Sequence, residues 1–453
     1  MTLLRSIVAG ALLLTGTPAA SNTGQASPVV LISIDGLRPD YVLEADTHGL
    51  SIPNLRRFLT QGSYATAVRG VFPTVTYPSH TTLLTGVNPA EHGVYANTTF
   101  DPFDKNFGGW YWYASDIRVP TLWDVASKAG IVTANVHWPV SVGAQINYNI
   151  PQIWRSGMPD DRKLLEALST PGILPRLEKE LGAYADGIDE SIAADETRGR
   201  FASRLIELER PGFTTVYFTA LDHTQHATGP FSAESNAVLE RIDAAVGRVI
   251  ASAQLASGGH AVICIVSDHG FARTDKEVNL LVAFRSAGLI SYDTAGKITS
   301  WRAAPWGAGA SAAIVVADSA DTVTFSRVRT LLDSLSSDSA SGIARVVDAS
   351  ALRDRGSWPG AAFAVSLRIG YKLGTRSTGR MVAPVAVSGM HGYDPVEPEM
   401  SSAFFLMGPG VPVGKSLGRI DMLDIAPTLA GYLGVELPLA KGGSKLRLAL
   451  ALH

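Results

Sequence analysis

The sequence predicts an α/β fold: a parallel-rich central sheet with helices on both faces, plus a smaller inserted subdomain. Three continuous apolar runs, at 29–34, 214–221 and 261–267, have the pattern of strands buried on both faces. Helical segments lie between these runs, and this alternation is typical of a parallel sheet. Such sheets bind ligands at the carboxyl ends of their strands, so the residues after the three runs are the first candidates for a site.

The other elements are predicted from the same periodicities. Helices are expected from Ile52 and at 121–130, 161–181, 188–208, 232–255 and 421–433, and strands at 63–71, 131–136 and 402–407. The polar and aromatic segment 98–113 is expected to form a surface loop over a cleft. From residue 273 the pattern changes to short strands, Gly-Ala-Ser stretches and one helix at 325–336. We therefore expect a catalytic α/β domain made of 22–272 and 386–453, with an inserted subdomain at 273–385.

Composition and charge limit the classes of protein to consider. The chain has 453 residues, 46% of them hydrophobic, so it can bury a large core as one domain with an insertion or as two domains. A net charge of −3 gives no reason to expect nucleic-acid binding. The single cysteine, Cys264, lies within an apolar run and is expected to be a buried small hydrophobe. No internal disulfide can form.

The N-terminal segment has the layout of a secretory signal peptide. Arg5 precedes an apolar run at 6–16, and small residues follow at 17–21. The apolar run is short for a membrane span, although an uncleaved anchor is the alternative. We expect residues 1–21 to be removed, which leaves a periplasmic or secreted protein without a stable membrane anchor.

A turn rich in threonine and proline, 72–80, precedes a predicted helix. Pro78 suits the first turn of a helix, where its missing N–H costs nothing. Thr74 is therefore expected at a helix N-terminus, where free N–H groups and the helix dipole favour an anion. Its hydroxyl can attack phosphorus if a base or a metal ion lowers its pKa. The alternative is an ordinary loop in which threonines cap the helix.

Acidic and imidazole side chains follow the predicted strands. The candidate metal ligands are three carboxylates and three imidazoles: Asp35, Asp222, His226, Asp268, His269 and His391. Mixed nitrogen and oxygen ligands suit two zinc ions better than calcium or magnesium. Each residue alone has an ordinary explanation, because strand-end acids often cap helices and most histidines are structural. Four histidines are assigned to structure: His80, His92, His137 and His223. Trp110 and Trp112 either stack on a substrate or cover the core.

The order of these residues resembles the alkaline phosphatase superfamily, and more closely its nucleotide pyrophosphatase/phosphodiesterase branch. The matching motifs are Ser-Ile-Asp-Gly-Leu-Arg at 33–38, Phe-Pro-Thr at 72–74, Pro-Ser-His at 78–80, Leu-Thr-Gly at 84–86, Pro-Ala-Glu-His-Gly at 89–93, His-Trp-Pro-Val-Ser at 137–141, Asp-His-Gly at 268–270 and His-Gly-Tyr-Asp-Pro at 391–395. The resemblance extends from about Val29 to Leu437 and is weakest across 273–385. It implies an alkaline phosphatase-like sandwich.

The resemblance also implies roles for individual residues. Thr74 would be the nucleophile, and also a metal ligand, that passes through a phosphothreonine intermediate. Asn97 would bind the substrate by donating to a non-bridging phosphate oxygen, together with the backbone N–H of Thr74. One zinc ion would be held by Asp35, Asp268 and His269, and the other by Asp222, His226 and His391.

These observations predict an exported two-zinc hydrolase of phosphodiester or pyrophosphate bonds that acts on small, nucleotide-type phosphate esters. Val75 stands where a larger side chain could hold a base, and Arg155 could contact phosphate, so a phosphomonoesterase or a phosphonate hydrolase is the alternative. A phosphoethanolamine transferase would need a lipid acceptor. A binding protein that had lost its chemistry would be expected to lack some of the ligands, all of which are present here.

Overall fold

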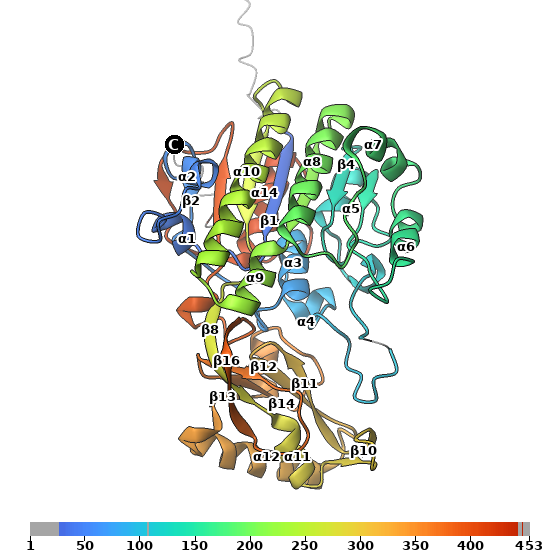
Figure 1. Cartoon of the computed structure of the whole chain (residues 1–453), viewed down its shortest axis with the longest axis vertical. Helices are drawn as coiled ribbons and strands as arrows, with labels where there is room; N and C mark the ends of the chain where they lie inside the picture. The colour runs from blue at the N-terminus through green and yellow to red at the C-terminus, as the bar shows by residue number, and fades with distance from the viewer. Residues whose placement is uncertain (1–26, 107, 443–445, 447–453) are drawn as a thin grey trace, which may run out of the picture.

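The computed structural model describes residues 27–106, 108–442 and 446 (Figure 1). The predicted signal peptide at 1–21 lies outside the described residues. Among the described helices, none combines the length and the apolar character that a membrane crossing requires.

The large domain is built on a mostly parallel sheet, as predicted. Among the described residues this sheet has eight strands, in the order β18 (Lys415–Ser416), β2 (Ser63–Tyr64), β17 (Phe404–Met407), β7 (Val262–Val266), β1 (Val29–Ile34), β6 (Phe213–Phe218), β4 (Thr133–Val136) and β5 (Tyr148–Ile150). The five strands from β7 to β5 run parallel, whereas β17 pairs antiparallel with both β7 and β2.

Helices cover both faces of this sheet because its central strands are apolar on both sides. Along β1, Val30 and Ile32 point into one core, while Val29 and Leu31 point into the other. The first core is covered by α2 (Pro53–Gln61), α8 (Ile192–Glu209) and α10 (Ala233–Ala256), of which α8 and α10 lie in front of the sheet in Figure 1. The second core is covered by α3 (Thr76–Thr85), α5 (Leu122–Lys128) and α14 (Ile425–Leu433).

Some predicted boundaries differ from the structure. The predicted helix at 161–181 is two helices, α6 (Asp161–Leu168) and α7 (Ile173–Leu181), because Pro171 and Gly172 interrupt it. The predicted strand at 63–71 contains only β2 and β3 (Ala67–Arg69). The strand predicted to reach Leu221 ends at Phe218, and α9 (Ala220–Thr228) begins two residues later.

The segment between the two parts of the large domain forms its own sheets, in the lower half of Figure 1. Its antiparallel sheet has the order β11 (Ala303–Ala308), β12 (Ser311–Val316), β14 (Phe363–Leu367) and β13 (Ile343–Asp348). A second sheet has the order β15 (Tyr371–Leu373), β8 (Ala272–Val278) and β16 (Val382–Met390). The helices of this segment are α11 (Leu280–Ser286), α12 (Thr322–Ser337) and α13 (Ala349–Asp354). β8 leads out of the large domain, and β16 leads back toward His391.

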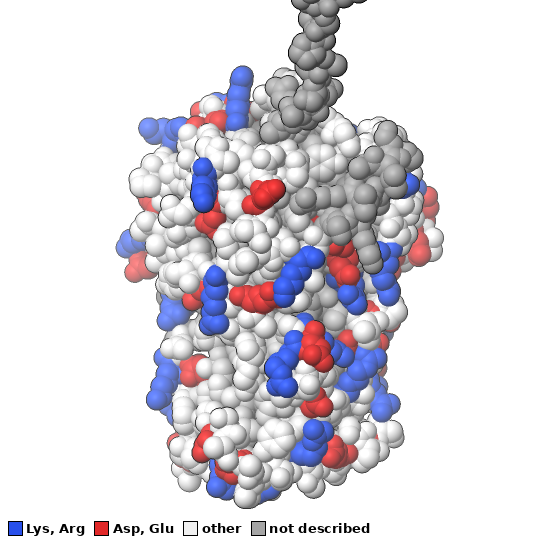
Figure 2. Space-filling view, turned by 180° about the vertical axis from the view of Figure 1, so that it is seen from behind, with Lys and Arg blue, Asp and Glu red and all other residues white. Residues whose placement is uncertain are grey.

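The remaining short elements connect these layers. They are α1 (Asp40–Leu43), α4 (Pro89–His92), β9 (Ile290–Tyr292), β10 (Ile298–Trp301), β19 (Arg419–Asp421) and four 3₁₀ turns (Ala114–Asp116, Ser339–Ser341, Pro398–Met400 and Met422–Asp424). On the face shown in Figure 2, basic and acidic side chains are interspersed rather than gathered by sign. This distribution agrees with the small net charge of −3.

Candidate active site

The acidic candidates come from three adjacent strands of the large sheet. Asp35 follows β1 and Asp268 follows β7, which pairs with β1 in parallel. On its other side β1 pairs with β6, and α9 after β6 carries Asp222 in its first turn. His226 follows one turn later on the same helix. The three acids thus lie close together at the carboxyl ends of three neighbouring strands.

Asp35, Asp268 and His269 form one compact group. His269 Nε2 lies 3.3 Å from Asp35 Oδ1 and 3.1 Å from Asp268 Oδ2. The side chains of Asp268 and His269 are fully buried, and that of Asp35 is 5% exposed. We call this set the closed half of the site.

Asp222, His226 and His391 form a more accessible group, which we call the open half. Asp222 Oδ2 lies 3.3 Å from His226 Nε2, and Asp222 Oδ1 lies 3.7 Å from His391 Nε2. The side chain of His226 is 35% exposed and that of Asp222 is 14% exposed. His269 also comes within 4.8 Å of the ligand atoms of Asp222 and His391, so it joins the two halves. Its ring stacks on His391, with centroids 3.6 Å apart.

All three imidazoles present the same nitrogen to the site. The Nδ1 atom of His391 donates to the carbonyl of Thr74 at 3.1 Å, that of His226 to Gly389 at 3.3 Å, and that of His269 to Gly270 at 3.0 Å. A carbonyl can only accept, so each of these Nδ1 atoms carries the proton. Each Nε2 atom then keeps a free lone pair, which is the arrangement that metal-binding histidines have in proteins.

The donor set fits divalent cations with mixed ligands. Three buried carboxylate oxygens have no hydrogen-bond partner among the described residues: Asp35 Oδ1, Asp222 Oδ1 and Asp268 Oδ2. Zinc bonds of about 2.0–2.2 Å put neighbouring corners of a tetrahedron about 3.3–3.6 Å apart. The measured nitrogen–oxygen separations of 3.1–3.7 Å match that spacing. The residues present therefore suit bound zinc.

The shifted pKa values of these side chains also favour a bound cation. Burial, and the nearby carboxylates of Asp222 and Asp268, raise the pKa of Asp35 well above its ordinary value. Burial and the neighbouring His269 hold the pKa of His391 well below its ordinary value. Burial also opposes ionisation of Asp222, but His226 and His391 outweigh it and lower the pKa of that carboxyl. A bound cation would relieve the repulsion between these acids and displace their protons.

Thr74 lies two residues before α3, on the predicted turn, and is completely buried. Its hydroxyl donates to the Tyr393 carbonyl at 2.7 Å, and its own carbonyl accepts from His391. The turn is thus tied directly to an imidazole of the open half. α3 begins at Thr76, so its first N–H groups are close to the Thr74 hydroxyl along the chain.

Asn97 lies beside the same helix start. The backbone N–H of Tyr77 donates to Asn97 Oδ1 at 3.0 Å. Because that N–H can only donate, the amide oxygen faces Tyr77 and the Asn97 NH₂ group is left as a donor. The carbonyl of Asn97 accepts from Tyr111 at 3.1 Å, which fixes the backbone of this residue too.

One residue behind the closed half, Tyr217, was missed by the sequence analysis. Its hydroxyl makes a short hydrogen bond to Asp35 Oδ2, and Asp35 Oδ1 has no hydrogen-bond partner among the described residues. His80 was assigned to structure; it is fully buried, with Nδ1 2.8 Å from the Thr76 carbonyl and Nε2 2.9 Å from the Ser33 hydroxyl. Tyr217 is an inward residue of a buried strand, and nothing in its local pattern distinguishes it from a core tyrosine.

The structure also gives the surroundings of the glycines near His391 and of the histidines assigned to structure. Gly389 and Gly392 lie on either side of His391. A Cβ atom at Gly389 would lie 2.4 Å from the Gln225 carbonyl, and one at Gly392 would lie 2.3 Å from the Ala308 carbonyl. These glycines therefore allow close packing of backbone on backbone. His92 is buried beside Thr82, His137 is buried against Tyr217, and His223 is exposed beside Glu190.

Aromatic rings form a wall next to Asn97. Trp110 packs on Trp112 and Trp154, with centroids 5.7 and 5.1 Å away, and on Tyr77 at 5.3 Å. Trp112 is buried, which makes it a core residue, whereas Trp110 and Trp154 are half-buried. Arg155 is exposed and lines a surface pocket of about 360 Å³ with Trp154.

Comparison of the sequence with known proteins identifies relatives of this chain. The family model described as type I phosphodiesterase/nucleotide pyrophosphatase matches residues 29–394. Ectonucleotide pyrophosphatase/phosphodiesterase family member 3 of Rattus norvegicus is 27% identical over 256 residues, which cover 54% of this chain and 25% of the relative. A venom phosphodiesterase of Macrovipera lebetinus is 26% identical over 262 residues, 54% of this chain and 26% of the relative. The match thus spans about a quarter of the length of these curated relatives.

The fold also matches solved structures. Human ectonucleotide pyrophosphatase/phosphodiesterase 5 superposes with a TM-score of 0.64 and 20% identity, covering 92% of this chain and 97% of that one. The murine protein, solved as an inactive variant in complex with AMP, gives a TM-score of 0.65 and 17% identity, with the same coverage. At this identity the likeness shows the fold, which is alkaline phosphatase-like. The family match, in contrast, runs through all the candidate ligands, and on that ground this chain belongs to the type I phosphodiesterase/nucleotide pyrophosphatase family, a branch of the alkaline phosphatase superfamily.

Proposed function

We propose that this protein is an exported hydrolase of phosphodiester or pyrophosphate bonds that uses two zinc ions and a phosphothreonine at Thr74. The observation that carries the proposal is the link between the nucleophile and both halves of the site. Thr74 is bonded through its carbonyl to His391 of the open half, whose ring stacks on His269 of the closed half. A hydroxyl at a helix start beside two groups of metal-competent ligands is suited to phosphoryl transfer.

The chain's own residues supply the steps of the reaction. Zinc, when bound by these ligands, would act as a Lewis acid that lowers the pKa of a hydroxyl and offsets charge on phosphate oxygens. The Thr74 hydroxyl gives up its proton to water and Oγ1 attacks phosphorus. The bond from phosphorus to the leaving-group oxygen breaks, the leaving group departs into solvent, where it can take up a proton, and the phosphoryl group stays on Thr74. The Asn97 NH₂ group donates to a non-bridging oxygen as its charge grows. Attack by water then breaks the bond from Thr74 Oγ1 to phosphorus and restores the enzyme.

Nucleotide-type substrates are supported by the family and by the aromatic wall. Val75 is buried with Phe72 and Trp358, so it has no free surface for a base. We place the leaving group or base instead against Trp110 and Trp154, because half-buried rings offer a flat apolar face for stacking. The AMP complex of the murine relative agrees with a nucleotide ligand for the family fold. The secreted character of the protein follows from the predicted signal peptide.

The nucleophile is tested by substituting Thr74 while the zinc ions stay bound. Thr74→Ala should reduce hydrolysis of a nitrophenyl diester at least ~10³-fold, because nothing remains to attack phosphorus, while the zinc content stays at the wild-type value. Thr74→Ser, which keeps a hydroxyl, should retain measurable turnover and a trappable phosphoenzyme. Undiminished activity of Thr74→Ala would refute the nucleophile. Wild-type rates on a diester, a monoester and a phosphonate then decide between a phosphodiesterase, a phosphomonoesterase and a phosphonate hydrolase.

A further inference from the structure

The short segment 391–394 touches the catalytic turn at two points. His391 donates to the Thr74 carbonyl, and the Tyr393 carbonyl accepts from the Thr74 hydroxyl. Any shift of this segment therefore displaces both the backbone and the hydroxyl of Thr74. The hydroxyl in particular depends on where the Tyr393 carbonyl lies, and the position of that carbonyl depends on the next residue, Asp394.

Asp394 is anchored by residues of the inserted segment. Its side chain is only 1% exposed, and its Oδ2 atom accepts from Arg355 at 2.7 Å and lies 3.2 Å from Arg345. Its backbone N–H donates to the Ser366 hydroxyl at 3.0 Å. Arg345 lies in β13, Ser366 in β14, and Arg355 immediately after α13. Burial opposes the charge on Asp394, but Arg355 and Arg345 outweigh it and lower the pKa of the carboxyl.

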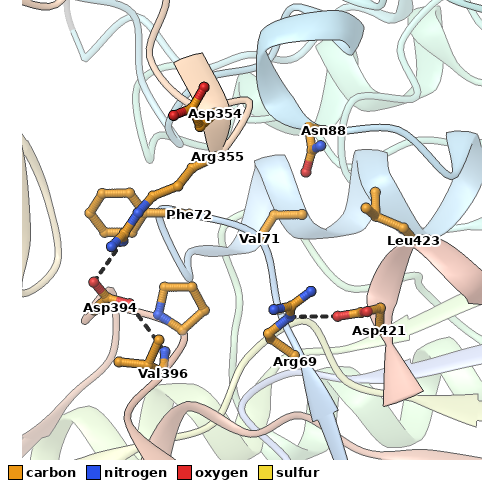
Figure 3. A pocket seen from close by; sticks show the side chains of 12 residues that line it. Arg69, Val71, Phe72, Asn88, Asp354, Arg355, Asp394, Val396, Asp421 and Leu423 are labelled. Atoms are coloured by element: carbon orange, nitrogen blue, oxygen red, sulfur yellow. Dashed lines mark hydrogen bonds and ion pairs between the residues drawn. The ribbon is translucent and has the colours of Figure 1, made fainter. Parts of the chain in front are cut away.

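Arg355 also contacts the other side of the catalytic turn. Its guanidinium carbon lies 5.6 Å from the centre of the Phe72 ring, and Phe72 in turn packs edge-on against Trp358 at 5.0 Å. Figure 3 shows Arg355 between Phe72 and Asp394, on the wall of a pocket of about 310 Å³ between the inserted segment and the large domain. One guanidinium thus contacts the residue two places before Thr74 and the residue that follows Tyr393.

We infer that Arg355 is a positioning residue for the nucleophile: by holding Asp394 and Phe72, it fixes the Tyr393 carbonyl and, through it, the Thr74 hydroxyl. Arg355 does not touch the reacting atoms. Its effect on the reaction is geometric, and a displacement of a reacting atom by about 1 Å costs roughly 100-fold in rate. The inserted segment therefore sets the attack geometry at the sheet edge, in addition to providing its own core. The kinetic part of this inference rests on the proposed function.

The pocket contains a matched control. Arg69 and Asp421 form a second arginine–aspartate pair that lines the same pocket, at 2.5 Å, between β3 and β19 (Figure 3). Both of these side chains are substantially exposed, at 57% and 42%, and neither contacts Asp394 or Phe72 in the interactions drawn. Removal of Arg69 thus deletes a similar charge pair from the same pocket without releasing Asp394.

The experiment compares Arg355→Met and Arg355→Lys with Arg69→Met. Arg355→Met should lower kcat by about 10–100-fold with KM within about twofold, because the substrate still binds but Thr74 is misplaced. Arg355→Lys restores the charge and should recover part of the loss. Arg69→Met should stay within about twofold of wild type. An equal loss in Arg355→Met and Arg69→Met, or a rise in KM alone, would overturn the positioning role.

A readout that does not use turnover separates this inference from the proposed function. The Val396 N–H donates to Asp394 Oδ1 at 3.1 Å, so its hydrogen exchange reports on the anchored carboxylate. Arg355→Met should exchange faster than wild type in peptides covering 390–397 and 72–77, and Arg69→Met should not. If Arg355→Met does not fold, Asp394→Asn, which keeps the shape of the side chain, should show the same exchange pattern. Unchanged exchange in these peptides would refute the inference even if the protein hydrolyses diesters. Faster exchange in Arg355→Met, together with a wild-type protein that does not hydrolyse diesters, would refute only the proposed function.

Discussion

The closed and open halves of the site are built from similar side chains but in different ways. Asp35, Asp268 and His269 follow strands in the middle of the sheet, and their side chains are between 0% and 5% exposed. Asp222 and His226 lie on α9, and His391 follows a strand that returns from the inserted segment. The His226 side chain is 35% exposed. Position on the sheet therefore goes with burial: the closed half is buried, whereas Asp222 and His226 of the open half are partly exposed.

The supports behind the two halves differ in the same way. Behind the closed half, Tyr217 bonds to Asp35 and the Gly36 N–H donates to Asp268 Oδ1 at 3.2 Å. In the open half, His226 is supported by the Gly389 carbonyl and His391 by the Thr74 carbonyl, both of which are backbone groups outside the large sheet. We expect the closed half to keep its geometry without metal and the open half to depend more on its ligand. The following predictions test this difference.

The largest effect is expected from the residue that joins the two halves. His269→Ala removes a ligand atom that lies near both sets of acids, so both ions should bind poorly. We expect zinc content to fall from two per chain toward zero and activity to fall at least ~10³-fold, about 4 kcal/mol of transition-state stabilisation. Mass spectrometry of the metal and the diester assay measure the two quantities. Loss of a single ion would show that the halves are independent.

A smaller effect is expected in the open half alone. His226→Ala should remove one zinc ion and leave the other, because the closed half keeps all its ligands, and activity should fall by roughly 100-fold. His223→Ala is the matched control, since His223 lies on the same helix but is exposed beside Glu190. Loss of both ions in His226→Ala would contradict the rigidity that we assign to the closed half.

Sequence patterns predicted the closed half better than its surroundings. Asp35 and Asp268 each follow an apolar run, and although either could have capped a helix, the structure places both at the carboxyl ends of neighbouring strands. Asp222 was placed at a strand end, yet the strand stops at Phe218 and Asp222 lies within a helix. Asp222 and His226 are four residues apart and share one face of α9, because helical periodicity does not depend on where the helix begins.

Contacts between distant segments could not be predicted in this way. Tyr217 and Asp35 are far apart in the sequence, and a tyrosine on a buried strand carries no local sign of its partner. The same is true of Arg355, which meets Asp394 only because β13, α13 and β14 are folded against the segment after β16. Sequence patterns identify the chemistry of a side chain and the face on which it lies, but pairing across the fold depends on tertiary packing.

A moderate effect is expected from the support behind the closed half. Tyr217→Phe keeps the ring and removes only the hydroxyl that bonds to Asp35, so the carboxylate can turn away from its ligand position. Zinc affinity should fall by about 10–100-fold, as is typical when a hydrogen bond to a metal ligand is lost. Tyr184→Phe is the control, because Tyr184 is also buried but packs on Phe201 instead. Equal zinc affinity in the two variants, measured by chelator competition, would contradict this support.

The smallest effect is expected outside both halves of the site, where Asp161 holds the loop that carries Arg155. The carboxylate accepts from the backbone N–H groups of Arg155, Ser156 and Gly157 at 3.0, 3.0 and 2.8 Å. Burial opposes its ionisation, but these donors outweigh burial and lower the pKa of Asp161. A lowered folded pKa gives stability that is present above the unfolded pKa of about 4 and is lost as pH falls through the folded pKa.

Asp161→Asn should therefore lower the melting temperature by a few degrees at pH 7, and the difference from wild type should shrink as pH falls below about 4. Zinc content should not change, because the carboxylate bonds only to its own loop. Thermal unfolding at pH 7 and at pH 3 checks the sign, and a difference that grew toward acid would contradict it. A loss of zinc in this variant would mean that this loop and the open half are one cooperative unit, and that the open half is less independent of its surroundings than its position on α9 suggests.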